Sequence, residues 1–253
     1  MPSPVILVIL VLLLLIAALC FAIWLREARI LVALFQKAFF PGRKGPAFYN
    51  NKHELFPQAA LLEQHTNLIR EEYLFVIGHA RIPRMHHVDG ANHRISFDEG
   101  PAWKTILLKG FDGWFEPNCA LFPATTALLK QMPSVSSAMF SILEPGARIP
   151  PHTGKFNGIL RYHLALAVPQ KGHCFILVNG EAYSWKKDEG VLFNDVYQHA
   201  VTNDSREYRV VLFIDVKKKA PALVAAINDL LYRIVHTSPG FRRALKLGTI
   251  NLD

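Results

Sequence analysis

RYHLALAV at residues 161–168 and YRVVLFIDV at residues 208–216 read as β-strands in this chain of 253 residues. Their residues alternate with a period of two and are rich in aromatic and β-branched side chains, which is typical of strands. Turn sequences rich in Pro, Gly, Asn and Asp separate them from three similar runs. These runs are SAMFSILE (137–144), HCFILVN (173–179) and VLFN (191–194). Short strands at this spacing predict a mainly β sandwich, jelly roll or barrel.

Alternation along the two longest strands sorts their polar residues onto one face. Arg161 and His163 share a face of the first strand, opposite Tyr162. Arg209 and Asp215 share a face of the second strand. Because a central-strand arginine is costly to bury without an anionic partner, this pattern suggests a carboxylate or phosphate inside a barrel. An arginine at the barrel edge, exposed to water, is the alternative explanation.

Two histidines lie on loop-like segments beside these strands. His152 follows the rigid sequence PGARIPP, and His199 follows VLFNDVYQ. A histidine at the mouth of a barrel is a suitable metal ligand. Ordinary packing or surface exposure is the usual role of two separated histidines. Their joint spacing with both arginines favours a functional site.

The apolar residues of the chain are concentrated at its beginning. The chain is 51% apolar with a mean hydropathy of +0.19, yet residues 5–25 contain no polar or charged side chain. Such a segment spans about 31 Å as a helix, enough to cross the hydrocarbon core. A cleaved signal peptide is the alternative, but no basic residue precedes the run. Residues 1–25 are therefore predicted to be a retained transmembrane anchor. Intrinsic disorder is excluded by the composition, and a disulfide scaffold by the count of three cysteines.

Charge predicts the orientation of the anchor. No Lys or Arg precedes the apolar run, whereas five basic residues follow it. They are Arg26, Arg29, Lys37, Arg43 and Lys44. The positive-inside bias then places the rest of the chain in the cytoplasm, on the inner membrane. The net charge of +8 all lies after residue 24, which suggests contact with anionic lipid headgroups. Nucleic acid is not predicted as a partner, because no recognition module is visible.

The remaining chain divides into three predicted parts. Residues 26–60 form a basic juxtamembrane segment that begins with an amphipathic stretch, residues 61–217 form the catalytic domain, and residues 218–253 form a C-terminal helix and tail. The apolar face of the helix over residues 220–236 either packs on the domain or lies on the membrane. That face carries Leu223, Ile227, Leu230, Leu231 and Ile234. The oligomeric state is not predicted.

The run from Ser141 to Asp215 resembles the aspartyl/asparaginyl β-hydroxylase family of iron- and 2-oxoglutarate-dependent dioxygenases. The similar strings are SILEPGARIPPHTGKFNGILRYHLALAVP and FNDVYQHAVTNDSREYRVVLFIDV. The resemblance implies a double-stranded β-helix, a jelly-roll or cupin-like fold, with flanking helices beside the N-terminal transmembrane helix. It implies that His152 and His199 are the iron ligands. It implies that 2-oxoglutarate is bound by Ser141, Arg161, His163 and Arg209.

One ligand of most non-haem iron oxygenases is missing. These enzymes use two histidines and a carboxylate, but the position two residues after His152 is Gly154. The same loss is a property of the family that the chain resembles. Asp195 and Asp215 are the nearest alternative carboxylates, although we expect Asp215 to pair with a base or to cap its strand.

The resemblance implies a reaction but leaves several substrates open. Fe(II), 2-oxoglutarate and O₂ would convert a substrate C–H bond to C–OH, with release of succinate and CO₂. The short anchored architecture and the predicted cytoplasmic domain favour an acyl chain of a membrane lipid, as in lipid A 2-hydroxylation. The alternatives are an ornithine-lipid hydroxylase, a peptidyl Asp/Asn β-hydroxylase and a catalytically silent barrel that binds an anion. Thr153, Lys155 and Asn157 are candidate rim residues.

Two further groups of side chains have a weaker pattern. Four basic residues with two tryptophans could meet a phosphorylated headgroup, or could form a solvated face and core aromatics. They are Arg81, Arg84, Lys104 and Lys109, with Trp103 and Trp114. His86, His87 and His93 resemble a metal cluster, but their spacing is loose and no metal is predicted there.

Overall fold

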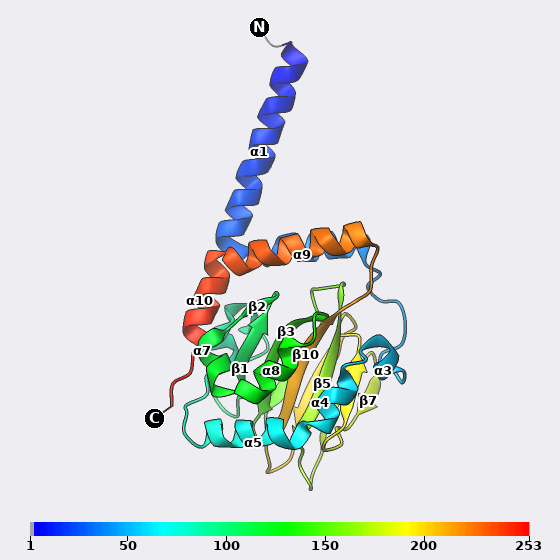
Figure 1. Cartoon of the computed structure of the whole chain (residues 1–253), viewed down its shortest axis with the longest axis vertical. Helices are drawn as coiled ribbons and strands as arrows, with labels where there is room; N and C mark the ends of the chain where they lie inside the picture. Colours follow the sequence, from blue (N-terminus) through cyan, green and yellow to red (C-terminus); the bar gives the residue numbers. More distant parts are fainter. Residues whose placement is uncertain (1–2, 253) are drawn as a thin grey trace.

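A long apolar helix projects from the rest of the molecule in this computed structural model, which describes residues 3–252 (Figure 1). This helix, α1, covers Pro4–Glu27, and the Ser3 hydroxyl caps it by accepting a hydrogen bond from the Ile6 amide at 3.3 Å. Its segment Pro4–Ala22 has a mean hydropathy of 3.5 with none of it buried. By length and composition, α1 is able to cross a membrane.

Two helices lie side by side across the base of α1 (Figure 1). α2 (Arg29–Phe39) follows α1 after the single residue Ala28, and α9 (Ala222–Thr237) packs beside it and leads into α10 (Pro239–Gly248). The buried Gln36 joins α2 to its neighbours. Its amide nitrogen donates to Asn228 Oδ1 at 2.7 Å, and its Oε1 accepts from the Gly158 backbone N–H at 2.9 Å. The juxtamembrane helix is therefore fixed to both α9 and the barrel.

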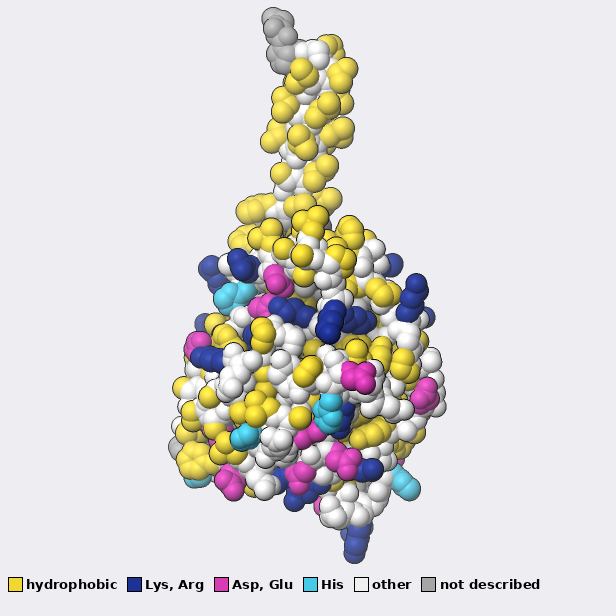
Figure 2. Space-filling view, turned by 45° about the vertical axis from the view of Figure 1, so that its right-hand side comes forward, with side chains coloured by type: hydrophobic (Ala, Val, Ile, Leu, Met, Phe, Trp, Pro, Cys, Tyr) yellow, Lys and Arg dark blue, Asp and Glu magenta, His cyan; other side chains and the backbone are white. Residues whose placement is uncertain are grey.

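The apolar face of α9 points largely away from the domain. α9 packs through Asn228, Tyr232 and Val235, whereas Leu223 and Leu230 are 74% and 56% exposed. Of the two alternatives for the leucine face, packing on the domain does not hold for these two residues, because Asn228 and Tyr232 form the contact with Gln36 instead. Figure 2 shows apolar side chains gathered where α1 meets the globular part, above a band of Lys and Arg.

Within residues 3–252, ten strands form two antiparallel sheets. The larger sheet has the order β2-β1-β3-β10-β5-β8, and the smaller has the order β4-β9-β6-β7. The larger sheet comprises β1 (Trp103–Gly110), β2 (Gly113–Trp114), β3 (Val135–Leu143), β5 (Ile159–Ala167), β8 (Gly190–Phe193) and β10 (Arg209–Lys217). The smaller comprises β4 (Arg148–His152), β6 (Cys174–Val178), β7 (Glu181–Tyr183) and β9 (His199–Asn203). This confirms the predicted jelly-roll class and all five predicted strands.

Short helices cover the outer face of the larger sheet (Figure 1). They are α4 (Ala59–Gln64), α5 (Thr66–Ile77), α7 (Glu116–Leu121) and α8 (Pro123–Lys130). In the chain, α3 (Lys52–Leu55) precedes α4. The short helix α6 (Met85–Val88) and the 3₁₀ turn η1 (Gly90–Asn92) follow α5 and precede β1. Tyr162 and Leu212 pack with Ile69 of α5 in the core beneath these helices.

The second core lies between the two sheets. Ala165 and Phe213 from the larger sheet pack there with Ile176 and Val201 from the smaller one. The larger sheet is therefore buried on both faces, which explains why its strands are nearly continuous in apolar residues. Period-two alternation sends Tyr162 to the helices and its neighbours Arg161 and His163 toward the barrel interior, as predicted.

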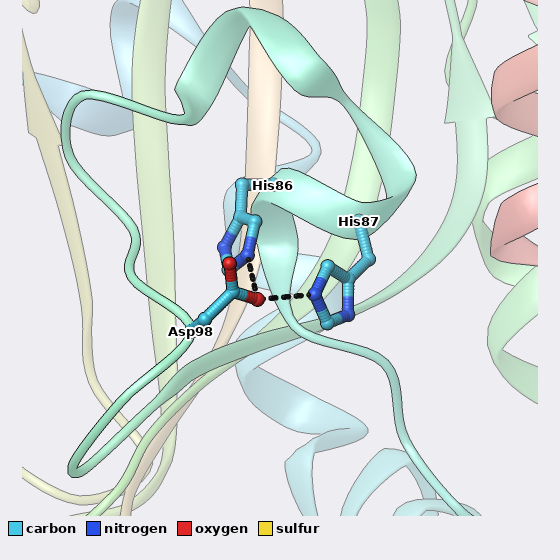
Figure 3. Close-up of side chains that lie close together, drawn as sticks. All are labelled: His86, His87 and Asp98. Carbon is cyan, nitrogen blue, oxygen red and sulfur yellow. Dashed lines mark hydrogen bonds and ion pairs between the residues drawn. The ribbon is translucent and has the colours of Figure 1, made fainter.

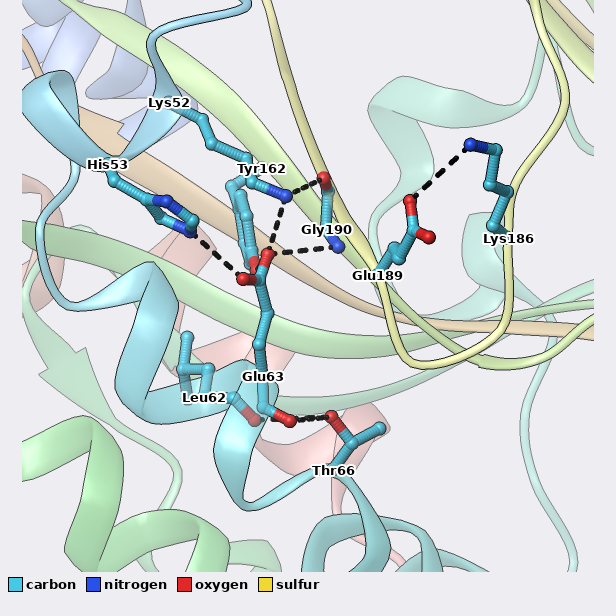
Figure 4. Close-up of polar contacts among 9 residues, drawn as sticks. All are labelled: Lys52, His53, Leu62, Glu63, Thr66, Tyr162, Lys186, Glu189 and Gly190. Carbon is cyan, nitrogen blue, oxygen red and sulfur yellow. Dashed lines mark hydrogen bonds and ion pairs between the residues drawn. The ribbon is translucent and has the colours of Figure 1, made fainter.

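A half-buried carboxylate, that of Glu63, fixes α4 to the barrel (Figure 4). Glu63 Oε1 accepts from the Tyr162 hydroxyl at 3.0 Å and from the Gly190 backbone N–H at 3.1 Å. Lys52 Nζ lies 2.8 Å from the same oxygen, and His53 Nε2 lies 2.9 Å from Oε2. Burial acts to raise the pKa of Glu63, but hydrogen bonds from Lys52 and His53 outweigh it and lower the pKa.

Candidate active site

His152 and His199 lie opposite each other on neighbouring strands. β4 ends at His152, β9 begins at His199, and the two residues are register partners in the antiparallel pair. Their ring centroids are 4.1 Å apart. Two segments that are remote in the sequence thus bring both predicted metal ligands to one point at the edge of the smaller sheet.

The backbone fixes the orientation of both rings. His152 Nδ1 lies 2.8 Å from the Pro150 carbonyl oxygen, and His199 Nδ1 lies 2.9 Å from the Tyr197 carbonyl oxygen. A carbonyl oxygen only accepts, so each Nδ1 must carry the proton. Each Nε2 is then an unprotonated lone-pair donor, which is the form that binds a metal ion.

Burial keeps both rings neutral. Burial is the largest cause that lowers the pKa of His152, and the nearby Arg161 lowers it further. Burial together with the neighbouring His152 lowers the pKa of His199 to about 3. The ligand form of both imidazoles is therefore already present in the folded protein at neutral pH.

The carboxylate of Asp195 lies beside Gly154, the residue at the position of the missing acidic ligand. A Cβ placed on Gly154 would collide with both oxygens of Asp195. Asp195 is 1% exposed, neither of its side-chain oxygens accepts a well-aligned hydrogen bond, and Arg161 Nη2 lies 3.0 Å from Oδ2. The Gly154 N–H donates to the Asp195 carbonyl at 2.7 Å. Two imidazole nitrogens with a nearby under-bonded carboxylate fit a divalent transition metal such as Fe(II).

Arg161 is neutralised by the chain itself. Its Nε donates to Asp215 Oδ1 at 3.0 Å, and Nη2 pairs with Asp195. The expectation that Asp215 pairs with a base is confirmed. Burial raises the pKa of Asp215 to about 6, against the opposing effect of Arg161. The sequence argument for a bound anion at Arg161 is therefore weakened, because two carboxylates already compensate its charge.

Unlike Arg161, Arg209 has no acidic partner among residues 3–252. It is 1% exposed, and its Nη1 donates to the Ser141 carbonyl at 3.2 Å and to Ser141 Oγ at 3.3 Å. Its Nε has no hydrogen-bond partner, and among residues 3–252 no carboxylate pairs with it. Burial lowers the pKa of Arg209 to about 10. A buried guanidinium with free donors is suited to a carboxylate ligand.

His163 lies in an aromatic pocket between the two sheets. Both of its ring nitrogens are buried without partners, and burial holds its pKa well below the usual range. Its ring is 5.0 Å from that of Phe193 and 6.0 Å from that of Trp185, centroid to centroid. The ring centroid of Trp185 also lies 4.9 Å from the guanidinium carbon of Arg209. This neutral imidazole leaves two polar atoms available to a ligand.

Two tryptophans at the site were not predicted. The Trp103 indole N–H donates to Ser141 Oγ at 2.9 Å, and Trp185 packs against Arg209 and His163. Trp103 was considered only as a headgroup or core residue, and Trp185 lies in a turn-like sequence with no strand pattern. No local signal marks Trp185, because its contacts depend on how the smaller sheet folds over the larger one.

The other predicted basic residues do not join this site. Lys104 pairs with Glu144 at 2.6 Å, and the buried Lys109 donates to the Val135 carbonyl at 2.5 Å. Arg84 donates to two backbone carbonyls of the loop before β1. These contacts favour a structural role over headgroup binding.

A second histidine cluster lies outside the two sheets, in the chain segment that connects α5 to β1 (Figure 3). His86 Nε2 and His87 Nε2 lie 2.9 Å and 2.8 Å from the same oxygen of Asp98, and the three side chains are close enough to share a cation. His93 is not part of it, because its Nδ1 faces the Gly90 carbonyl. Asp98 is 78% exposed, and hydrogen bonds from the two histidines lower its pKa.

The family model and the similar proteins of known name point to one family. Residues 63–219 match the family model described as aspartyl/asparaginyl beta-hydroxylase. An ornithine lipid ester-linked acyl 2-hydroxylase of Rhizobium tropici is 33% identical over 192 residues, which cover 75% of this chain and 68% of that protein. The aspartyl/asparaginyl beta-hydroxylase of Homo sapiens is 29% identical over 160 residues, 61% of this chain but 20% of that protein. Among solved structures, a predicted oxalate decarboxylase from Thermotoga maritima has a TM-score of 0.33 at 13% identity, covering 55% of this chain and 92% of that chain.

Proposed function

The chain belongs to the aspartyl/asparaginyl β-hydroxylase family and is a hydroxylase, and from this premise we propose that it hydroxylates an acyl chain of a membrane lipid. The observation that carries the choice of a lipid is the position of the barrel directly below an apolar helix long enough to cross a bilayer (Figure 1). The similarity to an ornithine lipid acyl 2-hydroxylase supports the same choice.

The identity of the lipid is a separate question. Lipid A was our first expectation, but the similarity favours an ornithine lipid as the first substrate to test. We further propose that α1 anchors the protein in the inner membrane with the barrel on the cytoplasmic side, because the basic residues all follow the apolar run.

In this proposal, His152 and His199 would hold Fe(II) through their unprotonated Nε2 atoms, and the under-bonded carboxylate of Asp195 would be available as a further ligand. Iron together with 2-oxoglutarate and O₂ supplies the oxidising chemistry that replaces a C–H bond with C–OH while 2-oxoglutarate becomes succinate and CO₂. The two backbone carbonyls keep both imidazoles in the ligating tautomer. Arg161 holds Asp195 in place through an ion pair of 3.0 Å to Oδ2.

The co-substrate would lie between the two sheets. Arg209 and Ser141 would bind the distal carboxylate of 2-oxoglutarate, because Arg209 is buried and has no acidic partner among the described residues. Arg161 and His163 share the inward face of β5 and complete the proposed binding set. The aromatic rings around His163 exclude water, which strengthens the charged hydrogen bond.

The test is hydroxylation by the full-length protein in vesicles. Fe(II) and 2-oxoglutarate would be added to vesicles that contain ornithine lipid, lipid A or neither, and succinate and lipid masses would be measured. We expect succinate release and a gain of one oxygen atom on an acyl chain. His152→Ala and His199→Ala should abolish both signals, while His93→Ala is the matched control outside the site.

Other outcomes would decide against the proposal. Hydroxylation of an Asp- or Asn-containing peptide, with every lipid unchanged, would assign a peptidyl β-hydroxylase instead. Binding of 2-oxoglutarate without turnover on any lipid or peptide would indicate a silent anion-binding barrel. Full activity of His152→Ala would refute the ligand assignment.

A further inference from the structure

An open groove of about 550 Å³ runs between α2 and the loop that follows His152. Ligand sites in proteins have volumes of roughly 300–1,000 Å³. One wall is formed by apolar side chains of α2, and the other by the loop and by the residue after Asp195. The wall residues are Ile30, Ala33 and Leu34 on α2, with Thr153, Gly154 and Val196 opposite.

The inner wall of the groove consists of residues that adjoin the candidate active site in the chain. Thr153 and Gly154 directly follow His152, and Val196 directly follows Asp195. The hydrogen bond from the Gly154 N–H to the Asp195 carbonyl holds these two segments together. A ligand in the groove would therefore lie beside the residues proposed to hold the metal.

The other wall of the groove is continuous with the apolar anchor. α2 starts one residue after α1 ends, and its groove residues Ile30 and Leu34 are 43% and 59% exposed. The space-filling view shows apolar side chains at this junction (Figure 2). If α1 crosses a bilayer, α2 lies at the interface, where an amphipathic helix buries its apolar face in lipid.

Basic side chains also line the groove. Lys37, Arg43 and Lys155 belong to its walls, and no acidic side chain among residues 3–252 forms an ion pair with any of them. Lys155 lies only three residues after His152 in the chain. The groove thus combines an apolar wall with cations that suit the phosphate or carboxylate of a lipid headgroup.

We propose that this groove binds one acyl chain of the lipid substrate, with the phosphate or carboxylate of its headgroup against Lys37, Arg43 and Lys155. The inference rests on the proposed function, since it names where the lipid lies. The substrate then reaches His152 directly from the bilayer. Because Lys155 is only three residues from His152 in the chain, a headgroup at Lys155 would present a carbon near the headgroup for hydroxylation, with the tail extending along α2.

The test uses the full-length protein in vesicles of phosphatidylethanolamine and phosphatidylglycerol. A phosphatidylglycerol with a diazirine in one acyl chain is photolysed, and the labelled peptides are mapped. We expect labels within residues 30–34 and 153–157. Ala33→Trp should fill the groove and reduce labelling and lipid hydroxylation by about tenfold or more. Ala38→Trp, the same change on an exposed position of α2 outside the groove, should leave both unchanged.

A second measurement separates blocking from misfolding. The rise in Tm caused by Co(II) and 2-oxoglutarate should be equal in wild type and Ala33→Trp, because neither ligand uses the groove. Unchanged hydroxylation in Ala33→Trp, or labels on residues 222–237 instead of the groove, would overturn the inference while the proposed function stands. If the wild type modifies no lipid but its groove is labelled, the proposed function fails and the groove assignment stands.

The headgroup part of the proposal has its own control. Lys155→Gln should weaken labelling by the phosphatidylglycerol probe several-fold and leave labelling by a neutral diacylglycerol with the same diazirine chain unchanged. An equal loss with both probes would show that Lys155 acts on the groove's shape and not on lipid charge.

Discussion

The carboxylate of Asp195 occupies the space into which a side chain on Gly154 would project. If His152 is the metal ligand, as we propose, Gly154 stands at the position where most non-haem iron enzymes carry their acidic ligand. The loss of that carboxylate is therefore accompanied by a second one at nearly the same place, delivered by the loop before β9. Arg161 holds it there by an ion pair of 3.0 Å.

Gly154→Ala should disturb this arrangement. The added methyl group must displace Asp195, because the two share one space and Asp195 is buried. We expect a loss of about 1–3 kcal/mol in the free energy of unfolding and weaker Co(II) binding. Thermal unfolding and calorimetric titration would measure the two effects. Gly90→Ala, where a Cβ meets nothing within 4 Å, is the control, and tight Co(II) binding by Gly154→Ala would show that Asp195 does not act on the metal.

Arg209→Met should separate ligand binding from folding. The buried guanidinium has no carboxylate partner among the described residues, so an apolar side chain of similar length should leave the Tm of the ligand-free protein unchanged or higher. 2-Oxoglutarate should lose about 2–5 kcal/mol of binding free energy. A Tm series with increasing 2-oxoglutarate would measure this loss. Arg148→Met, at an exposed pair with Asp204, should bind 2-oxoglutarate normally, and normal binding by Arg209→Met would remove Arg209 from the site.

The parts of the site that could be predicted from the sequence are those that depend on local alternation along a strand, and not those that depend on contacts between remote segments. The faces of β5 and β10 follow from alternation alone, so Arg161 and His163 were correctly placed on one inward face. β4 and β9 were not predicted as strands, because prolines and short length hide their pattern. The pairing of Asp195 with Arg161 was not predicted either, since it depends on how the loop before β9 folds over β5.

Gln36→Leu should loosen α2 from the barrel. The change removes the buried amide of Gln36. Its two partners, the Gly158 N–H and Asn228 Oδ1, are then left without these hydrogen bonds. Each unsatisfied buried group costs about 1–3 kcal/mol, so the Tm should fall clearly. Lipid hydroxylation should fall as well, because α2 forms a wall of the groove. Gln131→Leu, at the exposed glutamine that follows α8, is the control, and an unchanged Tm in Gln36→Leu would mean that α2 is held by its apolar contacts alone.

Glu63→Gln should destabilise the protein in a pH-dependent way. Glu63 binds Tyr162, Lys52 and His53, and its pKa is lowered by these contacts in spite of burial. Because the pKa of Glu63 is lowered in the folded state, its charge stabilises the fold fully at every pH above the usual glutamate pKa of about 4.3. This contribution to stability is lost as the pH falls through the folded-state pKa. At pH 7 we expect the variant to lose about 1–3 kcal/mol of unfolding free energy, the size of a charge-assisted hydrogen bond with a buried partner. The difference in Tm between the wild type and the variant should become smaller below about pH 4.3, because protonated Glu63 resembles glutamine. Tm measured from pH 7 to pH 3 would test this, with Glu116→Gln as an exposed control, and a gap that stays constant across that range would show that Glu63 acts through its shape and not its charge.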